Sequence, residues 1–296
     1  MHNILSKINK FIFKGIVMEK KYTHKASYYN DIALKLGHQL LGIKYLHYGY
    51  FEDTQKISLE SLQIAQEVYA KRLISKIPSD VKTILDVGCG TGEIARQLVE
   101  KGYIVTCVAP DPYLIEKTLE NTNNQVKTFT DLYENITEIE PDSIDLILMS
   151  ESCQYIKPDP GWEQNKKLLK KGGYLLICDF FKVKDIDDPY MSKSGQPLDN
   201  FYERARKANF TLLSEEDITA NVSPTMTLTQ DLIYEKVFPI GEAVIELTRR
   251  RYPLIYKIGN YFLKEKLLKL KNKYSALGAD KFCHYKKYLT LLFQKN

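Results

Sequence analysis

The stretch that decides the fold is ILDVGCGTGEIARQL, which runs from Ile84 to Leu98. An apolar run typical of a buried strand is followed by glycines at alternate positions, Gly88, Gly90 and Gly92, and then by a helical pattern. Because glycine has no Cβ atom, this spacing permits a tight turn and lets a ligand approach the main chain. The sequence therefore predicts a strand, a ligand-binding turn and a helix.

Apolar runs that suit buried strands alternate with helical stretches on both sides of this turn. The predicted strands span 83–87, 103–108, 126–129, 144–149, 174–179, 210–214 and 288–293, and the predicted helices span 92–101, 112–121, 162–170 and 198–208. Alternation of this kind is typical of a parallel sheet covered on both faces. The predicted fold class is α/β, with a doubly wound, seven-stranded, mostly parallel sheet, N-terminal helices and a helical cap inserted before the last strand.

These patterns divide the chain into successive segments. They are a basic tail or amphipathic segment at 1–25, an N-terminal helical lid at 26–78, a ligand-binding core at 79–225, a helical substrate cap at 226–285 and the last core strand at 286–296. The lid ends at Pro78, which cannot comfortably continue a helix. The aromatic side chains of the cap suit either an apolar acceptor pocket or an ordinary core.

The composition is that of a globular chain with reduced cysteines. Of 296 residues, 44% are apolar and 27% are charged. No apolar run approaches the roughly 20 residues of a membrane-spanning helix. The five cysteines are scattered, odd in number and without a CxxC pair. This usage argues for a cytoplasmic location and against a zinc site, so no metal is expected.

Positive charge collects at both ends of the chain. The net charge is +5, yet residues 1–25 hold six lysines against one glutamate, and the part from Ile240 onward holds thirteen lysines and arginines against four acids. Basic flanks indicate either an anionic partner or solvated helix faces. Residues 1–17 space apolar side chains helically between lysines and contain no acid. That pattern fits a weak membrane-surface helix or a loosely attached tail.

Two ligand classes use a glycine turn at the carboxyl end of a strand. A dinucleotide requires the spacing G-x-G-x-x-G, whose third glycine would fall at the position of Glu93. Asp86 lies two residues before Gly88, and carboxylates beside the turn would repel a pyrophosphate. A ligand with an ammonium and a sulfonium group has the opposite requirement. The spacing D-x-G-x-G-x-G therefore favours S-adenosylmethionine over NAD.

At this point the stretch DVGCGTG, between its hydrophobic strand and its helix, closely resembles motif I of class I S-adenosylmethionine-dependent methyltransferases. The resemblance implies a Rossmann-like core with S-adenosylmethionine as its cofactor. It also implies a cofactor-binding role for each of Asp86, Gly88, Cys89, Gly90 and Gly92.

Later strand ends extend the resemblance over about 80–215. The family's second strand usually ends in an acid that binds the ribose, which points here to Asp111 with Pro112 beside it. The alternative is that Asp111 only caps the following helix. After the third strand, the resemblance implies that Asp131 and the backbone of Leu132 lie near the adenine, unless Asp131 is an ordinary loop residue.

Other segments resemble small-molecule and lipid methyltransferases. PDSIDLILMSES resembles the fourth motif, where Ser150 and Glu151 emerge beside the sulfonium. LGIKYLHYGYFED resembles the HHGYY segment of tocopherol and related isoprenoid enzymes, and SESCQYI resembles the EATCH stretch of sterol enzymes. The resemblance implies catalytic roles for Glu151, His47 and Tyr50. Tyr155 stands where those enzymes carry a histidine, so no base is carried over to that position.

The predicted function is methyl transfer from S-adenosylmethionine to C, N or O of a small-molecule or lipid-like acceptor, which is hydrophobic, isoprenoid-like or aromatic. A nucleic-acid methyltransferase is the alternative that the basic ends permit, although no NPPY-like tetrapeptide follows the fourth strand. A non-catalytic cofactor-binding subunit is the third hypothesis. The predicted location is the cytoplasm, with peripheral membrane contact through the N-terminal segment.

Overall fold

The structure is a computed structural model that describes residues 44–52, 56–183, 186–275 and 278–296. The predicted basic tail and the first part of the predicted lid, up to residue 43, lie outside the described residues. The described part of the lid is a loop at 44–52 and the helix α3 (Leu59–Ser75). α3 begins at Ser58, whose hydroxyl accepts a hydrogen bond from the backbone N–H of Ser61.

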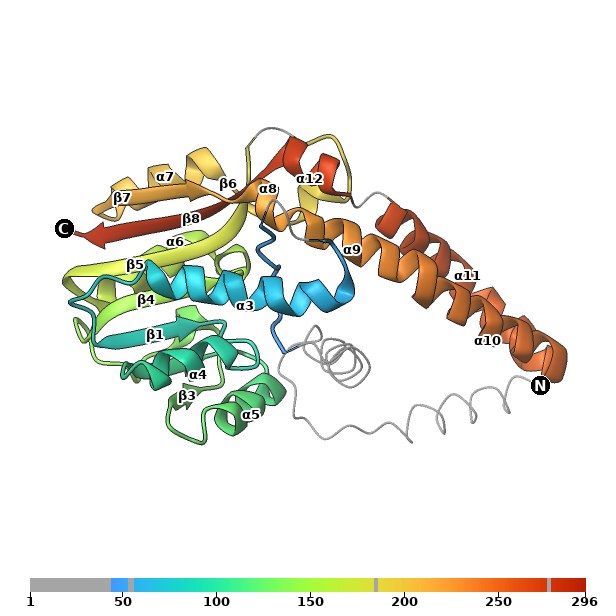
Figure 1. Cartoon of the computed structure of the whole chain (residues 1–296), viewed down its shortest axis with the longest axis horizontal. Coiled ribbons are helices and arrows are strands. Elements are labelled where there is room, and N and C mark those ends of the chain that lie inside the picture. The colour runs from blue at the N-terminus through green and yellow to red at the C-terminus, as the bar shows by residue number, and fades with distance from the viewer. Residues whose placement is uncertain (1–43, 53–55, 184–185, 276–277) are drawn as a thin grey trace, which may run out of the picture.

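A single mixed sheet forms the centre of the molecule (Figure 1). Its strands are β1 (Thr83–Val87), β2 (Ile104–Val108), β3 (Lys127–Phe129), β4 (Ile144–Ser150), β5 (Leu169–Lys182), β6 (Gln196–Pro197), β7 (Phe210–Asp217) and β8 (Lys286–Lys295). The order is β3-β2-β1-β4-β5-β8-β7, with the short β6 paired to β5. All pairings are parallel except those of β8, which runs antiparallel between β5 and β7. The predicted doubly wound, mostly parallel sheet is confirmed, and β6 is an addition to the predicted strands.

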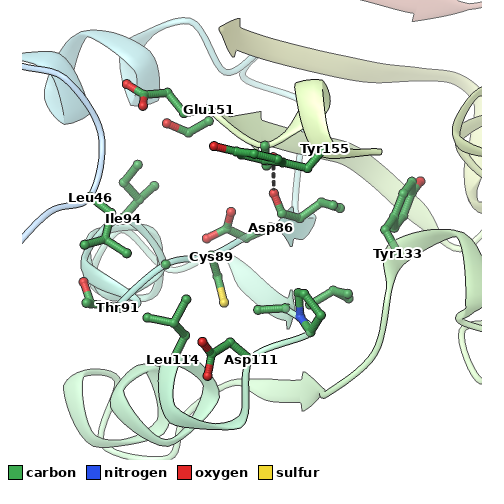
Figure 2. A pocket seen from close by; sticks show the side chains of 18 of the residues that line it. Leu46, Asp86, Cys89, Thr91, Ile94, Asp111, Leu114, Tyr133, Glu151 and Tyr155 are labelled. Atoms are coloured by element: carbon green, nitrogen blue, oxygen red, sulfur yellow. Dashed lines mark hydrogen bonds between the residues drawn. The ribbon is translucent and has the colours of Figure 1, made fainter. Parts of the chain in front are cut away.

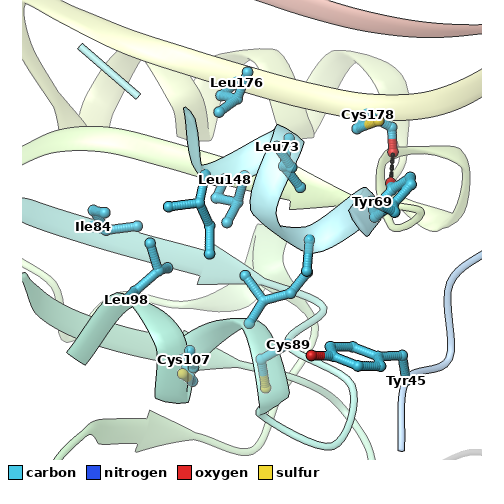
Figure 3. Close-up of a cluster of buried hydrophobic side chains, with 14 of the residues drawn as sticks. Tyr45, Tyr69, Leu73, Ile84, Cys89, Leu98, Cys107, Leu148, Leu176 and Cys178 are labelled. Atoms are coloured by element: carbon cyan, nitrogen blue, oxygen red, sulfur yellow. Dashed lines mark hydrogen bonds between the residues drawn. The ribbon is translucent and has the colours of Figure 1, made fainter. Parts of the chain in front are cut away.

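Helices cover the sheet on both faces and enclose two hydrophobic cores. α3, α4 (Glu93–Glu100) and α5 (Pro112–Asn121) share one core with Ile84 of β1, whereas α6 (Pro158–Leu168) and α7 (Leu198–Lys207) share the other with Leu85. Both of these neighbouring β1 side chains are fully buried. Figure 3 shows the first core, where Leu73 of α3 and Leu98 of α4 gather with Ile84. Two-sided burial explains why the central strands are continuous apolar runs.

The remaining helices lie between β7 and β8. They are α8 (Thr219–Val222), α9 (Pro224–Leu232), a π-helical turn at Ile233–Val237, α10 (Phe238–Arg251), α11 (Pro253–Ser275) and α12 (Ala279–Tyr285). The predicted helical cap at 226–285 is interrupted at Tyr252, because the residue before a proline is disfavoured in helical conformation. In Figure 1, α10 and α11 form a hairpin that projects away from the sheet. We call it the helical hairpin.

Candidate functional site

A cavity of about 670 Å³ opens at the carboxyl ends of β1, β2 and β4, the edge where open parallel sheets bind ligands (Figure 2). Its volume lies within the range of roughly 300–1,000 Å³ for small-molecule sites. Its walls come mainly from segments 45–47, 86–91, 108–111, 131–134 and 150–152. Most of the predicted site residues are therefore brought together. No described residue of the predicted cap lines the cavity, because the helical hairpin leads away from it.

The glycine turn after β1 has the conformation that its spacing predicts. Gly88, Gly90 and Gly92 have φ values of 76°, 58° and 82°, in the left-handed region that favours glycine. Gly88 and Gly90 line the cavity together with Cys89, whereas Gly92 does not. A Cβ at Gly92 would lie 2.7 Å from the Cα of Thr118 in α5. In the structure Gly92 thus allows the start of α4 to pack closely against α5, and its cofactor-binding role stays a prediction.

Gly88→Ala is expected to destabilise the fold, whereas Gly90→Ala is expected to weaken ligand binding. A Cβ at Gly88 would lie 2.4 Å from that of Ser152, but a Cβ at Gly90 would meet nothing nearer than Leu46 at 3.6 Å. Both alanines strain the backbone by about 1–2 kcal/mol, and the overlap should cost Gly88→Ala at least about 1 kcal/mol more. Urea denaturation of both variants measures the difference. Equal free energies of unfolding would contradict this assignment.

Asp86 provides a buried carboxylate at the centre of the cavity floor (Figure 2). The side chain is 2% exposed, and its Oδ2 atom has no hydrogen-bond partner among the described residues. Burial raises the pKa of Asp86 to about 7. A buried carboxylate oxygen without a partner is costly for a folded protein. Its position in a cavity wall therefore indicates a ligand group that donates a hydrogen bond or carries positive charge.

Asp111 both caps a helix and lines the cavity. Its carboxylate accepts a hydrogen bond from the backbone N–H of Tyr113 at 2.9 Å, as the N-cap of α5. Asp111 therefore caps the helix, as the alternative interpretation expected, and it also lines the cavity. Pro112 occupies the first turn of α5 and does not line the cavity. In the structure Pro112 helps to start the helix, and its expected contact with a ligand stays a prediction.

The loop after β3 forms the opposite wall. The carboxylate of Asp131 accepts hydrogen bonds from the backbone N–H of Leu132 at 2.6 Å and from the side chain of Asn135 at 3.2 Å. Both Asp131 and Leu132 line the cavity. The buried Tyr133 adds a ring to this wall, held by a hydrogen bond from its hydroxyl to Asn165 at 2.7 Å. No motif in the sequence indicated Tyr133, although its place in FTDLY directly follows the predicted pair.

Glu151 follows β4 in a left-handed conformation, with φ of 53°. Such strain in a residue other than glycine is often found at functional sites. Its Oε1 atom accepts hydrogen bonds from the backbone N–H of Tyr48 and from the hydroxyl of Tyr288, both at 2.6 Å. Burial nevertheless raises the pKa of Glu151 to about 8. The adjacent Ser150 lines the same wall, and its hydroxyl lies 3.1 Å from that of Tyr69.

Glu151→Gln is expected to remove a pH dependence of stability. The pKa of Glu151 in the folded protein, about 8, lies above its ordinary value of 4.5. Its contribution to the free energy of unfolding is therefore fully present below the ordinary pKa and is lost as the pH rises through the folded one. Between about pH 5 and pH 9, the wild-type protein should lose a few kcal/mol relative to the variant. Urea denaturation across this range would contradict the assignment if the two curves ran parallel.

His47 lines the cavity and has one ring nitrogen without a hydrogen-bond partner among the described residues. Its ring stacks on Tyr69, with centroids 4.2 Å apart, and is buried. The Nδ1 atom lies 2.8 Å from the carbonyl oxygen of Tyr48, which can only accept, so Nδ1 carries the proton. The Nε2 atom has no partner among the described residues. Because burial lowers the pKa of His47 to about 4, the ring is neutral near pH 7 and Nε2 is an acceptor.

The catalytic role of Tyr50 stays a prediction. This side chain does not line the cavity, and the guanidinium of Arg72 lies 4.2 Å from the centre of its ring. Within this loop, Tyr45, Leu46 and His47 line the cavity, whereas Tyr50 packs beside α3. Wall residues that the sequence analysis did not single out include Leu46, Thr91, Ile94, Leu114 and Ser152. All five lie within two positions of a predicted site residue in the chain, which was the available signal.

The described residues contain no group of three or more His, Cys, Asp or Glu side chains arranged to hold a metal ion. Within the same part of the chain, no helix combines the length and the apolar character that a bilayer crossing requires.

Comparisons with known proteins agree with this geometry. Residues 85–177 match the family model described as a methyltransferase domain. A protein of Geobacillus sp. (strain WCH70) that is assigned to the methyltransferases is 32% identical over 118 residues, which cover 38% of this chain and 48% of that protein. The chain thus spans about half the length of this curated relative.

Solved structures share the fold at low sequence identity. The [4+2]-cyclase SpnF superposes with a TM-score of 0.68 at 18% identity, covering 93% of this chain and 96% of that chain. Geranyl diphosphate C-methyltransferase from Streptomyces coelicolor A3(2), solved with Mg²⁺, geranyl diphosphate and S-adenosyl-L-homocysteine, gives 0.62 at 12% identity, covering 86% and 92%. The likeness establishes the Rossmann-like fold. The match of residues 85–177 to the methyltransferase domain model confirms the resemblance seen in the sequence.

Proposed function

We propose, from the methyltransferase domain that residues 85–177 match, that this protein is an enzyme that transfers a methyl group from S-adenosylmethionine to a small-molecule acceptor. The observation that carries the proposal is the pairing of a left-handed glycine turn with the buried, unpartnered Oδ2 of Asp86 in one cavity. The bare turn admits a ligand to the main chain, and the carboxylate selects one with positive charge. A pyrophosphate would meet repulsion at the same place.

The residues around the cavity suggest where each part of the cofactor would bind. Asp86 would bind the ammonium group, and the glycine turn would bound the methionine moiety. Asp111 would accept hydrogen bonds from the ribose hydroxyls. Asp131 and the backbone of Leu132 would contact the adenine, and the ring of Tyr133 would pack beside it. Support comes from the place of all these residues in one cavity wall.

The acceptor would bind at the end of the cavity formed by the loop at 45–47 and by Glu151. Tyr45, Leu46 and Tyr155 bring mostly apolar surface to this end, which suits a hydrophobic, isoprenoid-like or aromatic molecule. The cofactor, when bound, supplies the transferable methyl group on a neutral leaving group. What the protein adds is alignment of the two partners, which can lower the barrier by ~7–11 kcal/mol.

Two side chains could manage charge at the acceptor. The neutral Nε2 of His47 could take a proton from a hydroxyl, a phenol or a protonated amine. Glu151, already holding two donors on one oxygen, could as a carboxylate stabilise positive charge that develops on a carbon acceptor. A cation near Glu151 would favour its ionised form, opposing the effect of burial. The choice among C, N and O transfer depends on which of the two acts.

Four buried thiols and one exposed thiol among the described cysteines support a reducing, cytoplasmic location. A nucleic-acid methyltransferase remains the alternative, since the basic ends could bind phosphates. The fold alone does not decide the chemistry, because a cyclase shares it. An experiment therefore also has to test the hypothesis that the protein binds the cofactor but transfers no methyl group.

Two measurements test the proposal. Isothermal titration should show binding of S-adenosylhomocysteine and none of NAD or FAD. Incubation with S-adenosylmethionine that carries a tritiated methyl group should then label an organic-soluble fraction of cell extract, unchanged by ribonuclease treatment. Label in RNA would favour the alternative, and binding without any labelled fraction would indicate a non-catalytic protein. Uptake of NAD or FAD in place of S-adenosylhomocysteine would refute the ligand assignment.

A further inference from the structure

The helical hairpin is the most exposed apolar surface of the described chain. No described residue of α10 is buried. Along one side of α10, Ile240, Val244 and Leu247 are 64%, 57% and 62% exposed. Beyond the turn, Leu254 and Ile258 at the start of α11 are 75% and 60% exposed. A cluster of large aliphatic side chains at this exposure usually marks a binding surface.

The same hairpin carries the positive charge of the protein. Residues 238–275 contain nine lysines and arginines against three glutamates, a local charge of +6, whereas the whole chain has +5. Arg249, Arg250 and Arg251 end α10 at the tip of the hairpin, and Leu254 lies in the first turn of α11, three residues after Arg251. Glu246 pairs with Arg249 at 2.9 Å and with Arg250 at 2.6 Å. One glutamate facing two arginines leaves a positive surplus beside the exposed aliphatic side chains.

We propose that the tip of the helical hairpin binds the surface of an anionic lipid bilayer. The hairpin of a second copy of the chain would bring a charge of +6 against the +6 of this hairpin, and the two would repel each other. Residues 1–17, with three lysines and no acid, would be repelled by the hairpin in the same way. An anionic partner fits the charge. A nucleic acid would leave the aliphatic side chains of the tip in water, whereas a bilayer offers phosphates to the arginines and acyl chains to Leu254 and Ile258.

Docking through the tip would fix the orientation of the cavity relative to the bilayer. α9, at the base of the hairpin, packs on the loop that borders the cavity: the hydroxyl of Tyr48 donates to the sulfur of Met226 at 3.0 Å, and the N–H of Gly49 donates to Thr225 at 3.0 Å. The proposal does not depend on methyl transfer. Binding to a bilayer would be tested in the same way if the protein bound the cofactor without transferring a methyl group.

The test is flotation of the full-length protein with vesicles of equal parts phosphatidylcholine and phosphatidylglycerol, compared with phosphatidylcholine alone. Binding only to the anionic vesicles, weakened by salt, is expected. The variant R249Q/R250Q/R251Q should bind about 100-fold more weakly, since a basic residue at an anionic surface typically contributes about five-fold. The variant L254S/I258S keeps the charge and should also bind more weakly, because the aliphatic contact is lost.

A matched control removes the same charge elsewhere. Arg204, Arg206 and Lys207 form the basic last turn of α7, and R204Q/R206Q/K207Q should bind like the wild-type protein. The proposal is overturned if the wild-type protein fails to float, or if the tip and α7 variants lose affinity equally. It is also overturned if L254S/I258S binds the anionic vesicles like the wild-type protein. Tighter binding of an RNA oligonucleotide than of the vesicles, lost in R249Q/R250Q/R251Q, would overturn it as well. Isothermal titration with S-adenosylhomocysteine, expected unchanged in every variant, keeps this outcome separate from the proposed function.

Discussion

Asp86→Asn is expected to weaken binding of S-adenosylhomocysteine by at least about 100-fold, the typical cost of removing one partner from a buried, hydrogen-bonded charge pair. Asparagine keeps the shape of the side chain but loses the charge that would bind the ammonium group. The free protein should respond in the opposite direction. Since burial raises the pKa of Asp86 to about 7 from 3.8, the ionised carboxylate destabilises the empty fold as the pH rises through that value. Above about pH 7 the variant should therefore unfold at a higher temperature.

Two readouts together identify the role of Asp86. Calorimetric titration measures the affinity, and thermal denaturation with and without S-adenosylhomocysteine measures the stability. Glu134→Gln is the control, because it removes a carboxylate from the opposite wall of the same cavity. It should change neither quantity by more than a few-fold or a few degrees. An Asp86→Asn protein that keeps wild-type affinity would contradict the assignment of the ligand.

Glu151→Gln is expected to lower turnover by about 100-fold, a typical contribution of a positioned acid or base, and to change cofactor affinity by less than about three-fold. The carboxylate lies at the proposed acceptor end of the cavity, and the substitution leaves Asp86 and the glycine turn intact. The assay is transfer of the tritiated methyl group into the fraction labelled by the wild-type protein. Equal rates for the two proteins would remove Glu151 from the chemistry.

Tyr288→Phe tests whether the charge of the Glu151 carboxylate or its position matters for turnover. It deletes one hydrogen bond to Oε1 of Glu151 and leaves the carboxylate in place. A donor to a carboxylate lowers its pKa, so the variant should move the pH profile of turnover upward while Glu151→Gln flattens it. Unchanged profiles in both variants would show that Glu151 only supports the loop through Tyr48.

Much of the core could be predicted because its signals are local. β1, α5 and the glycine turn appear where the pattern places them, since apolar periodicity, the proline at the start of α5 and left-handed glycines act within a few residues. The helix predicted at 162–170 instead begins at Pro158, and β5 extends from Leu169 to Lys182 beyond the predicted 174–179. Pairing with β8 extends β5 to Lys182, and Leu169 at its start pairs with Ile144 of β4. Such long-range pairing leaves no pattern in the sequence of the strand itself.

The site was harder to predict where distance in sequence matters. Asp86 lies near the carboxyl end of β1 and Glu151 directly follows β4, so parallel topology brings them to one edge. Tyr288 donates a hydrogen bond to Glu151 from 137 positions away in the sequence, and no motif around Tyr288 indicates this contact. Tyr50 shows the converse: its segment resembles a catalytic one, but its side chain packs beneath Arg72. Motif resemblance located the loop and could not decide which way each side chain turns.

The antiparallel placement of β8 has a consequence for synthesis of the protein on the ribosome. β7 joins the sheet only through β8, and β8 is translated after the whole block from α8 to α12. Until then the nascent chain exposes the edge of β5, which invites association with other chains or capture by a chaperone. The strand that closes this edge also delivers Tyr288 to Glu151. The pairing of β8 with β5 therefore closes the sheet and brings Tyr288 to Glu151 in one step of folding.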